Sequence, residues 1–529
     1  MYKISNLKLK VDFKKDDLNS LVAKKLKVSA SDVFNLQFLK LSLDARHKPD
    51  IFYVATISFE CKVKLNLKRL SDVSLYEKKE PKKLLFNKSS NQNIIVVGSG
   101  PSGLFAGLTL AESGANVTIL ERGYSMEKRI IAVNNLFENG ILDEKCNIQF
   151  GEGGAGTFSD GKLNTGIKSE HIEKVLQTFV ECGAENEILY SSKPHIGTDI
   201  LSNVIVNMRK RLENLGSKIL FEHKLVDVNI ECGKVKSVEV ETNDGRKNFP
   251  CDILILAIGH SSRDTIRMLF EKNLALKQKP FSMGYRIEHL QKDLNVSQYG
   301  ENYYSLLPPA DYHLSEHLEN GRGVYTFCMC PGGVVVPAMS EKNTIVTNGM
   351  SYSKRDGVNC NSAILCTIET KDFPSEDVLS GIDLQEKYER YAYEKNHSYK
   401  ATVQRVGDFL ISIPTTKLGK VLPTFKPDYV LGDVSDMLPE FVVNSIKEGI
   451  LALDKKLKGF ADPDALLTGV ETRSSAPYQV IRGIDMMSNI ENLYMIGEGA
   501  GFAGGIVSSA VEGIKCANVI IEKSNHKLK

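Results

Sequence analysis

The chain has 529 residues, of which 42% are apolar and 25% are charged, and its formal net charge is +2. This length exceeds that of one simple domain, so roughly two to four domains are expected. The near-neutral charge gives no field that would favour nucleic acid or an acidic membrane surface, and no run of about eighteen apolar residues indicates a transmembrane helix.

The N-terminus and the cysteines predict a cytoplasmic protein. The opening run MYKISNLKLKVDFKKDD lacks the apolar core of a signal peptide. Ten cysteines are spread from Cys61 to Cys516 without a CxxC pair or the ligand spacing of a zinc site. We therefore expect reduced thiols and no metal centre.

Residues 1–76 predict a small α/β domain. Alternating stretches at ISNLKLKVDF and IFYVATISFECKVKL are typical of strands, and DLNSLVAKKLKV between them is typical of a helix. Residues 77–92 are charged, are interrupted by Pro81 and lack apolar periodicity. They are interpreted as a linker.

A glycine-rich turn follows the strand at 94–97. With 41 glycines in the chain, a GxGxxG pattern occurs by chance about 0.25 times, so the pattern alone is weak. Its context is specific, because Gly98, Gly100 and Gly103 lie between a buried-type strand and a helix that opens at Pro101 and Ser102. Such glycines permit a tight turn, close approach to a pyrophosphate and helix–strand contact, and the helix N-terminus attracts the phosphates.

The next strand, NVTILE, ends at Glu121 and Arg122, and Glu121 lies 18 residues beyond Gly103. An acid at this place can accept hydrogen bonds from ribose hydroxyls. We therefore expect both residues beside a bound dinucleotide.

Two later segments indicate which dinucleotide is bound. CDILILAIGHSSRDT ends a strand at Gly259, and NLYMIGEGAGFAGGIVSSA runs from a strand into Gly497 and Glu498 and then into a helix that begins near Gly505 and Ile506. These residues resemble the FAD signature of the glutathione reductase-like flavoprotein superfamily. The resemblance implies that Glu498, where that superfamily often has Asp, binds the ribityl chain, and that the following helix points at the flavin pyrimidine ring. FAD is therefore preferred over NAD.

The chain shows no second strand–GxGxxG–helix unit between residues 130 and 460, so a separate NAD(P)H domain is not expected. The fold class is α/β, with a three-layer Rossmann-like FAD-binding domain. This domain is discontinuous, formed by 93–280 and 461–529, and it carries an inserted α+β substrate domain at 281–460.

Further stretches extend the resemblance over nearly the whole chain. LKLSLDARHKPDIFYVATISFE, FGEGGAGTFSDGKLNTG, FCMCPGGVVVPA, NGMSYSKRDGVNCNSAI and TGVETRSSAPYQVIR resemble a family of bacterial FAD-dependent dehydrogenases. The resemblance implies redox chemistry with FAD and leaves the substrate open.

Two motifs supply candidate catalytic residues from loops and strands. The six-glycine stretch 151–166 is interpreted as backbone beside the flavin, with Lys162 at the ring; a solvent loop is the alternative. In FCMCPGG, Cys328 and Cys330 alternate on a strand and share one face. Cys330 is a candidate redox thiol or nucleophile, and buried packing is the alternative.

Arg473 and His260 complete the candidates. Arg473, next to Glu471 and Thr472, could bind a substrate carboxylate or stabilise reduced flavin; an Arg–Glu structural pair is the alternative. His260 follows the turn at Gly259 and is a candidate proton donor, or otherwise a structural histidine.

The sequence thus favours an oxidoreductase that transfers hydride between flavin N5 and a small organic substrate held between the two domains. Transiently bound NAD(P)H or a protein could supply electrons. A monooxygenase variant remains open. An FAD-dependent RNA-modifying enzyme is an alternative, although the chain lacks a stripe of basic and aromatic residues. A non-catalytic flavin-binding scaffold is a second alternative.

Overall fold

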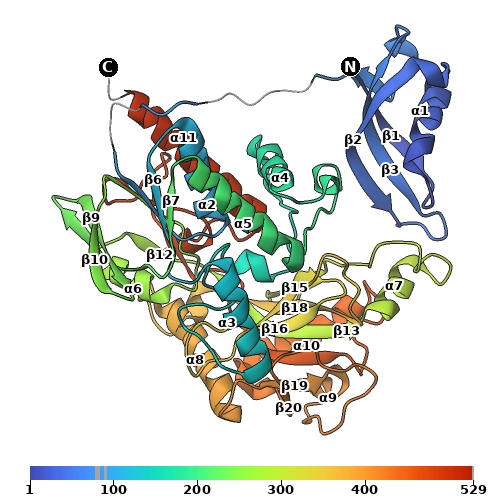
Figure 1. Cartoon of the computed structure of the whole chain (residues 1–529). Helices are drawn as coiled ribbons and strands as arrows, with labels where there is room; N and C mark the ends of the chain where they lie inside the picture. Colours follow the sequence, from blue (N-terminus) through green and yellow to red (C-terminus); the bar gives the residue numbers. More distant parts are fainter. Residues whose placement is uncertain (78–83, 88–91, 527–529) are drawn as a thin grey trace.

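The computed structural model describes residues 1–77, 84–87 and 92–526. Figure 1 shows three units along the chain: an N-terminal unit in blue, a unit built around strands β6 and β7, and a unit in yellow and orange. Each unit is built on its own principal sheet. None of the helices in these described ranges is long and apolar enough to span a membrane.

The N-terminal unit is an antiparallel sheet of order β2-β3-β1-β4 with one helix. Its elements are β1 (Tyr2–Leu9), α1 (Leu18–Leu26), β2 (Val33–Asp44), β3 (Phe52–Cys61) and β4 (Val73–Leu75). Leu18, Val22 and Leu26 recur every four residues on α1 and are buried in the core of this unit. Strands β1 and β3 and helix α1 agree with the elements expected for residues 1–76, whereas β2 and β4 were not among the expected strands.

The N-terminal unit contacts the rest of the chain through β2. The Leu41 amide donates to the Tyr190 carbonyl at 2.7 Å, and the Ser192 amide donates to the Leu41 carbonyl at 2.9 Å. The Phe38 ring stacks on Tyr190 with centroids 5.2 Å apart. Much of the linker predicted at 77–92 lies outside the described residues, but Phe86 is buried, and its amide bonds the Ser113 carbonyl.

The second unit contains a five-stranded parallel sheet of order β23-β11-β5-β6-β7. The strands are β5 (Ile94–Val97), β6 (Val117–Leu120), β7 (Lys218–Leu220), β11 (Ile253–Leu256) and β23 (Leu493–Met495). Strand β23 therefore returns to this sheet after a long excursion of the chain.

Alternate residues of these strands pack into two different layers. Ile94 and Val96 face a core to which α2 (Pro101–Ser113), α4 (His171–Glu181), α5 (Thr198–Asn214) and α11 (Ile506–His526) contribute. Ile95 and Val97 face a second core, shared with α6 (Arg263–Glu271) and the antiparallel sheet β10-β9-β8. The sheet is therefore the middle of three layers, as expected. Its strands are apolar throughout because both of its faces are buried.

Two details of this unit follow directly from the sequence. The NDG turn joins β9 (Lys234–Thr242) to β10 (Gly245–Pro250), and β8 (Lys224–Glu231) pairs with β9. Helices α2 and α11 lie side by side (Figure 1), and a Cβ on Gly513 would lie 2.2 Å from the Ser102 carbonyl oxygen. The glycine thus sets how closely these two helices approach.

The third unit is a seven-stranded sheet of order β14-β15-β18-β13-β21-β19-β20. Its strands are β13 (Phe281–Leu290), β14 (Ser315–His317), β15 (Gly323–Cys330), β18 (Asn359–Ile368), β19 (Ala401–Arg405), β20 (Tyr429–Leu431) and β21 (Leu466–Glu471). Around it lie α7 (Gln291–Tyr299), α8 (Ser380–Asn396), α9 (Val406–Leu410) and α10 (Glu440–Asp454). A ribbon of β16 (Val334–Pro337) and β17 (Thr347–Met350) packs against it.

The C-terminal boundary predicted for the inserted domain is wrong. Residues from 461 onward were expected in the FAD-binding domain, yet β21 pairs antiparallel with β13 and β19 in the seven-stranded sheet. All six residues of β21 are buried. The strand belongs to the insert because only a central position in that sheet satisfies its backbone and covers both of its faces.

Candidate functional site

The three glycine-containing segments identified in the sequence meet at one edge of the parallel sheet. Gly98 follows β5 with φ +103°, and a Cβ there would lie 2.3 Å from the Ala257 carbonyl oxygen at the end of β11. A Cβ on Gly497, after β23, would lie 2.2 Å from the Ser102 Oγ. Only glycine permits these approaches, and they bring together the carboxyl ends of three parallel strands.

The N-terminus of α2 faces an open space. Gly100 is the N-cap and Pro101 is the first helical residue, where a missing N–H is tolerated. A Cβ on Gly100 would meet only the Gly154 Cα, at 3.9 Å. Gly103 does not line the cavity and instead packs on the Gly98 carbonyl beneath the turn. The open helix end is suited to an anionic group.

Glu121 lines the cavity, as expected for a residue beside the dinucleotide, but its carboxylate is already bonded within the protein. Its carboxylate is buried and accepts four hydrogen bonds of 2.8–3.0 Å, from the Ser99 amide and hydroxyl and from the Gly123 and Gly151 amides. A carboxylate has about four acceptor sites, so none is left for a ribose hydroxyl. Glu121 organises the loops of the cradle. Arg122 lines the cavity, stacks on Phe150 and donates to Asp264.

His260 and Glu498 face each other across the cradle. The His260 Nδ1 lies 3.2 Å from a Glu498 carboxylate oxygen. The imidazole is 8% exposed, and its Nε2 is buried without a protein partner. Helix α11 begins at Ile506, next to Gly505, as expected, and both residues line the same cavity. The unpartnered Nε2, at the wall of the cavity, is free to exchange a hydrogen bond with a ligand held there.

The six-glycine stretch 151–166 is not a solvent loop. Gly154, Gly156 and Lys162 line the cavity, and only Asn164 and Gly166 of the stretch are exposed. Arg129 of α3 (Met126–Asn139) holds this loop from behind. Its fully buried guanidinium donates at 2.6–3.3 Å to the carbonyl oxygens of Asn147, Ile148, Gly151, Glu152 and Gly154.

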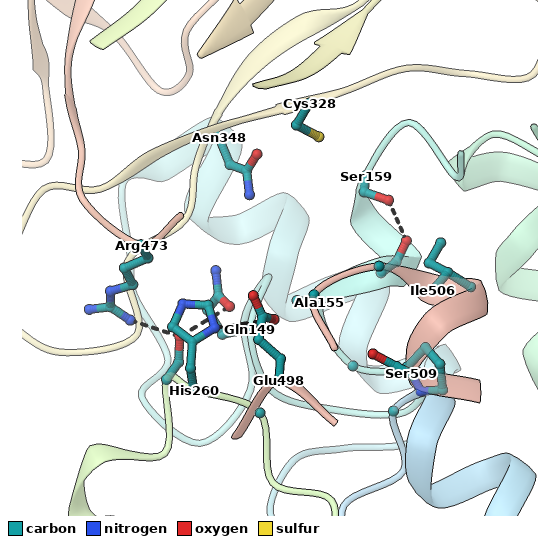
Figure 2. Close-up of a pocket in the computed structure, with 18 of the residues that line it drawn as sticks. Gln149, Ala155, Ser159, His260, Cys328, Asn348, Arg473, Glu498, Ile506 and Ser509 are labelled. Carbon is teal, nitrogen blue, oxygen red and sulfur yellow. Dashed lines mark hydrogen bonds and ion pairs between the residues drawn. The ribbon is translucent and has the colours of Figure 1, made fainter. Parts of the chain in front are cut away.

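Arg129 was missed in the sequence, although a signal was present. It falls on the buried stripe of α3, between Met126 and Val133. A charged residue on such a stripe is rarely buried unless its charge or donors are satisfied. The other missed residues lie in the cavity wall; those labelled in Figure 2 are Gln149, Ala155, Ser159, Asn348 and Ser509.

The cavity has a volume of about 870 Å³ and extends from the cradle into the third unit. Figure 2 shows Glu498, Ile506 and Ser509 on one side and Asn348 and Cys328 on the other. Lys162 lies in the wall and donates to the Met329 carbonyl of β15. One continuous space therefore touches both the cradle and the seven-stranded sheet.

The two cysteines do not share a face, contrary to the expectation from alternation. Phe327 pairs with Ala363 and Cys330 with Asn361, so β15 carries one extra residue, and Cys328 adopts φ +44°. This bulge breaks the alternation. Cys328 lines the cavity, whereas Cys330 is fully buried behind it. Cys330, the predicted candidate, therefore does not reach the cavity, and its neighbour does.

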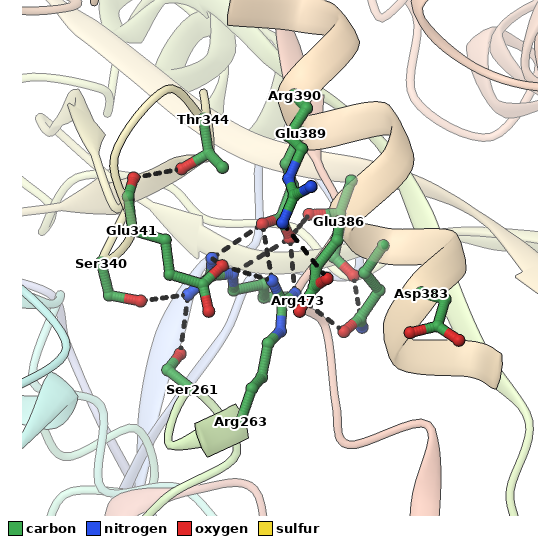
Figure 3. A network of polar contacts seen from close by, with 12 residues as sticks. Ser261, Arg263, Ser340, Glu341, Thr344, Asp383, Glu386, Glu389, Arg390 and Arg473 are labelled. Carbon is green, nitrogen blue, oxygen red and sulfur yellow. Dashed lines mark hydrogen bonds and ion pairs between the residues drawn. The ribbon is translucent and has the colours of Figure 1, made fainter. Parts of the chain in front are cut away.

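Arg473 lines the cavity, as expected for a candidate site residue, but its guanidinium is largely taken up by a buried ion network. Its guanidinium donates to both carboxylate oxygens of Glu389, at 3.1 and 2.7 Å, and to Ser261 and Ser340. Arg263 approaches the same Glu389 from α6, at 2.7 and 2.9 Å. Figure 3 shows this convergence. The alternative of a structural Arg–Glu pair is therefore the better description, although the partner is Glu389 and not Glu471.

Glu471 pairs instead with Arg286, which is fully buried on β13. The Arg286 Nη1 donates to both Glu471 oxygens at 3.2 and 3.1 Å, and its Nε donates to Asn361 at 2.7 Å. Burial raises the pKa of Glu471 to about 7, and Arg286 opposes that shift. Glu471 also lines the cavity, so it offers a carboxyl group that titrates near neutrality.

Three family descriptions match parts of the chain. "FAD-dependent protein, C-terminal domain-like" matches residues 280–474, "FAD binding domain" matches 93–131, and a domain of unknown function matches 1–60. The first range ends three residues after β21, in agreement with the corrected boundary. An uncharacterised protein of Clostridium beijerinckii is 45% identical over 535 residues, which cover 98% of each chain.

Solved structures are much less similar. A geranylgeranyl bacteriochlorophyll reductase-like protein of Thermoplasma acidophilum is 12% identical with a TM-score of 0.37, covering 82% of this chain and 79% of its own. CtdE in complex with FAD is 12% identical with a TM-score of 0.33, covering 82% and 88%.

FAD fits the residues present. The FAD-binding match covers the turn at Gly98, the helix N-terminus and strand β6, which Glu121 follows. The unpartnered Nε2 of His260 and the open space at Gly100 lie along the same cavity. The cofactor of this protein is FAD.

Proposed function

Since the chain belongs to the same family as the Clostridium beijerinckii protein, with 45% identity over 98% of both chains, and binds FAD, we propose that it is an FAD-dependent oxidoreductase. Its reaction is hydride transfer between flavin N5 and a small organic substrate. The observation that carries this proposal is the single cavity shared by the cradle and the seven-stranded sheet.

The cradle residues would hold the cofactor. Amides at the start of α2, beyond Gly100, would bind the diphosphate, because they are unpaired and lie at the positive end of the helix dipole. Glu498 and the N-terminus of α11 would hold the ribityl chain and the ring end. Bound FAD supplies a two-electron redox couple, and the protein determines its position and surroundings.

The wall opposite the cradle would bind the substrate. Asn348 presents an amide there and Glu471 a carboxyl group whose pKa is raised to about 7 by burial. A carboxyl group that titrates near the working pH can take up or release a proton as hydride moves. His260, with Nδ1 beside Glu498 and Nε2 free, is a second proton carrier facing the cavity.

The proposal is tested on purified protein under anaerobic conditions. The flavin absorbance is recorded while small hydroxy, amino and unsaturated acids, NADH and NADPH are added one at a time. The expected result is one of two changes: an electron donor bleaches the oxidised flavin and is itself oxidised, or an electron acceptor restores the absorbance of dithionite-reduced flavin and is itself reduced. Protein that retains FAD, is reduced by dithionite, and exchanges electrons with none of these compounds would favour a flavin-binding scaffold.

A further inference from the structure

The bulge in β15 places a pair of thiols at the wall of the cavity. Cys328 is the extra residue, partly exposed to the cavity, and its side chain points into it beside Asn348 (Figure 2). Cys330 lies directly behind and is fully buried, and its Sγ is 3.3 Å from the Cys328 carbonyl oxygen. Residues two apart in a chain have Cα atoms at most about 7 Å apart, and disulfides span about 4.4–6.8 Å.

Two cations hold this part of the strand. The Arg286 Nη2 donates to the Cys328 carbonyl and lies 3.3 Å from the Cys330 sulfur. Lys162 donates to the carbonyl of Met329, between the two cysteines. The two acidic side chains that face the thiols each form an ion pair with an arginine. Asp160 pairs with buried Arg355, and Glu471 pairs with Arg286. Positive charge therefore dominates at the sulfurs.

The two thiols have opposite acidities. A hydrogen bond from Cys330, together with Arg286 and Lys162, lowers the pKa of Cys328 to about 6. Burial, together with the neighbouring Cys328, raises the pKa of Cys330 well above its usual range. An accessible thiolate in front of a buried protonated thiol is the arrangement of an attacking and a resolving cysteine.

We propose that Cys328 and Cys330 are a redox-active dithiol pair that reduces small disulfides entering the cavity. This reaction is separate from hydride transfer and needs no other group of the protein. Cys328 is the attacking residue and Cys330 the resolving residue. Arg286 is a positioning residue that compensates the negative charge formed on Cys330 when it loses its proton.

The steps balance within the pair. The Cys328 thiolate attacks one sulfur of a disulfide R–S–S–R, the S–S bond breaks, and RS⁻ leaves with Cys328 joined to the other half. The Cys330 proton passes to the departing thiolate, and the Cys330 sulfur then attacks the Cys328 sulfur, releasing the second RS⁻. The pair loses two electrons and forms one disulfide, and the substrate gains both electrons as RSH and RS⁻.

The test uses cystamine as the probe on FAD-loaded full-length protein. Among the ten cysteines only Cys61, Cys232 and Cys328 are not buried, so the background carries Cys61→Ser and Cys232→Ser. The expected product carries a Cys328–Cys330 disulfide in its peptide mass map, has no added mass and has released two cysteamines. With Cys330→Ser, one cysteamine remains attached to Cys328. A stable adduct in the background protein, or no reaction, would overturn the proposal.

A second measurement needs no change at either cysteine of the pair. Iodoacetamide labelling of Cys328 in the background protein is followed against pH, with N-acetylcysteine as the reference. The rate is expected to rise through a midpoint near pH 6 and to exceed that of the reference about tenfold at that pH, after allowing for the lower nucleophilicity of an acidic thiol. A midpoint above pH 8 would show that Cys328 is protonated at neutral pH and would overturn the proposal.

The flavin absorbance is recorded in the same samples. Disulfide formation in protein whose flavin no substrate reduces would leave this inference standing and count against the proposed oxidoreductase. Flavin reduction by a substrate, without reduction of cystamine by the cysteine pair, would leave the proposed oxidoreductase standing and overturn this inference.

Discussion

At the scale of single residues, the site depends on which glycines have room for a Cβ atom and which do not. Gly98 and Gly497 are enclosed by protein atoms, whereas Gly100 faces open space. The surroundings also determine the pKa values of the titrating groups. Glu471 and Cys328 share the charge of Arg286. Burial raises the pKa of Glu471 to about 7 against that charge, whereas a hydrogen bond from Cys330, together with Arg286, lowers the pKa of Cys328 to about 6.

Replacing Gly100 by alanine separates binding from folding. The new methyl group would meet only the Gly154 Cα at 3.9 Å, so stability should hold, while the methyl group fills the approach to the diphosphate. The FAD dissociation constant, measured by flavin fluorescence titration, is expected to rise at least about tenfold, or about 1.4 kcal/mol. Gly432→Ala, whose Cβ would be 3.3 Å from the Thr402 methyl group, is the matched control. Equal FAD affinities for both variants would contradict the assignment.

Glu471 should give stability a recognisable pH dependence. Its pKa of about 7 in the folded state lies above the ordinary 4.5, so its contribution is present below pH 4.5 and is lost as pH rises through 7. Urea unfolding of Glu471→Gln and its parent at pH 5 and pH 8 should reveal a relative loss in the parent of up to about 3 kcal/mol.

Cys328, next to Glu471, changes the pH dependence of stability in the opposite direction. Because its pKa is lowered in the folded state, it stabilises the fold more as the pH rises. The comparison is therefore made in a Cys328→Ser background. If parent and variant keep a constant difference in unfolding free energy between the two pH values, Glu471 does not titrate as described.

At the scale of elements, a buried arginine fixes the glycine-rich loop to α3. Arg129→Lys keeps the charge but offers three donors on a single nitrogen, so several of the five carbonyls now bonded would lose their partners. Unfolding free energy is expected to fall by about 2–3 kcal/mol, and FAD should bind more weakly. Urea unfolding and FAD titration measure both effects.

The control for this element is Lys128→Arg, because Lys128 is the neighbouring residue on α3 with a side chain 66% exposed. Its effect on unfolding should stay within about 0.5 kcal/mol. A loss for Arg129→Lys no larger than that of the control would show that the loop is held by its own backbone.

At the scale of the whole molecule, the second and third units are joined by charge. Glu389 of α8 binds Arg263 of α6 and Arg473 after β21 (Figure 3), and all three side chains are nearly inaccessible. The two arginines hold the pKa of Glu389 far below its usual range despite burial, so it stays ionised. The Ser261 hydroxyl, next to His260, donates to Gln149 and accepts from Arg473, which ties the cradle to the network.

Glu389→Gln should therefore destabilise the molecule strongly. Removing one partner of a buried network leaves positive charge uncompensated, with an expected loss of about 3–5 kcal/mol in urea unfolding. Glu386→Gln, on the same helix, removes pairs with the more exposed Arg267 and Arg390 and should cost at most about 1 kcal/mol. Similar losses for both variants would mean that the network contributes no more than a surface pair.

Much of the nucleotide-binding unit could be predicted from local patterns. Gly98, Gly100 and Gly103 after an apolar strand, and Ile506 after a glycine-rich turn, occupy the expected places because turn and cap requirements act over a few residues. The seven-stranded sheet was harder to predict. Its strands carry Arg286, Glu288 and Asn361 at buried positions, and only partners far away in the chain satisfy them.

The sequence by itself determined the cradle, the three-layer unit that carries it and the cofactor, because each depends on short-range backbone geometry and apolar periodicity. The tertiary structure alone decided which side chains are free for chemistry. Glu121 and Arg473 are taken up by donors and acceptors from distant segments, and a single bulge turns Cys328, not Cys330, toward the cavity. Hydrogen-bond partners and strand register are fixed by packing between remote parts of the chain, and spacing along the sequence does not encode them.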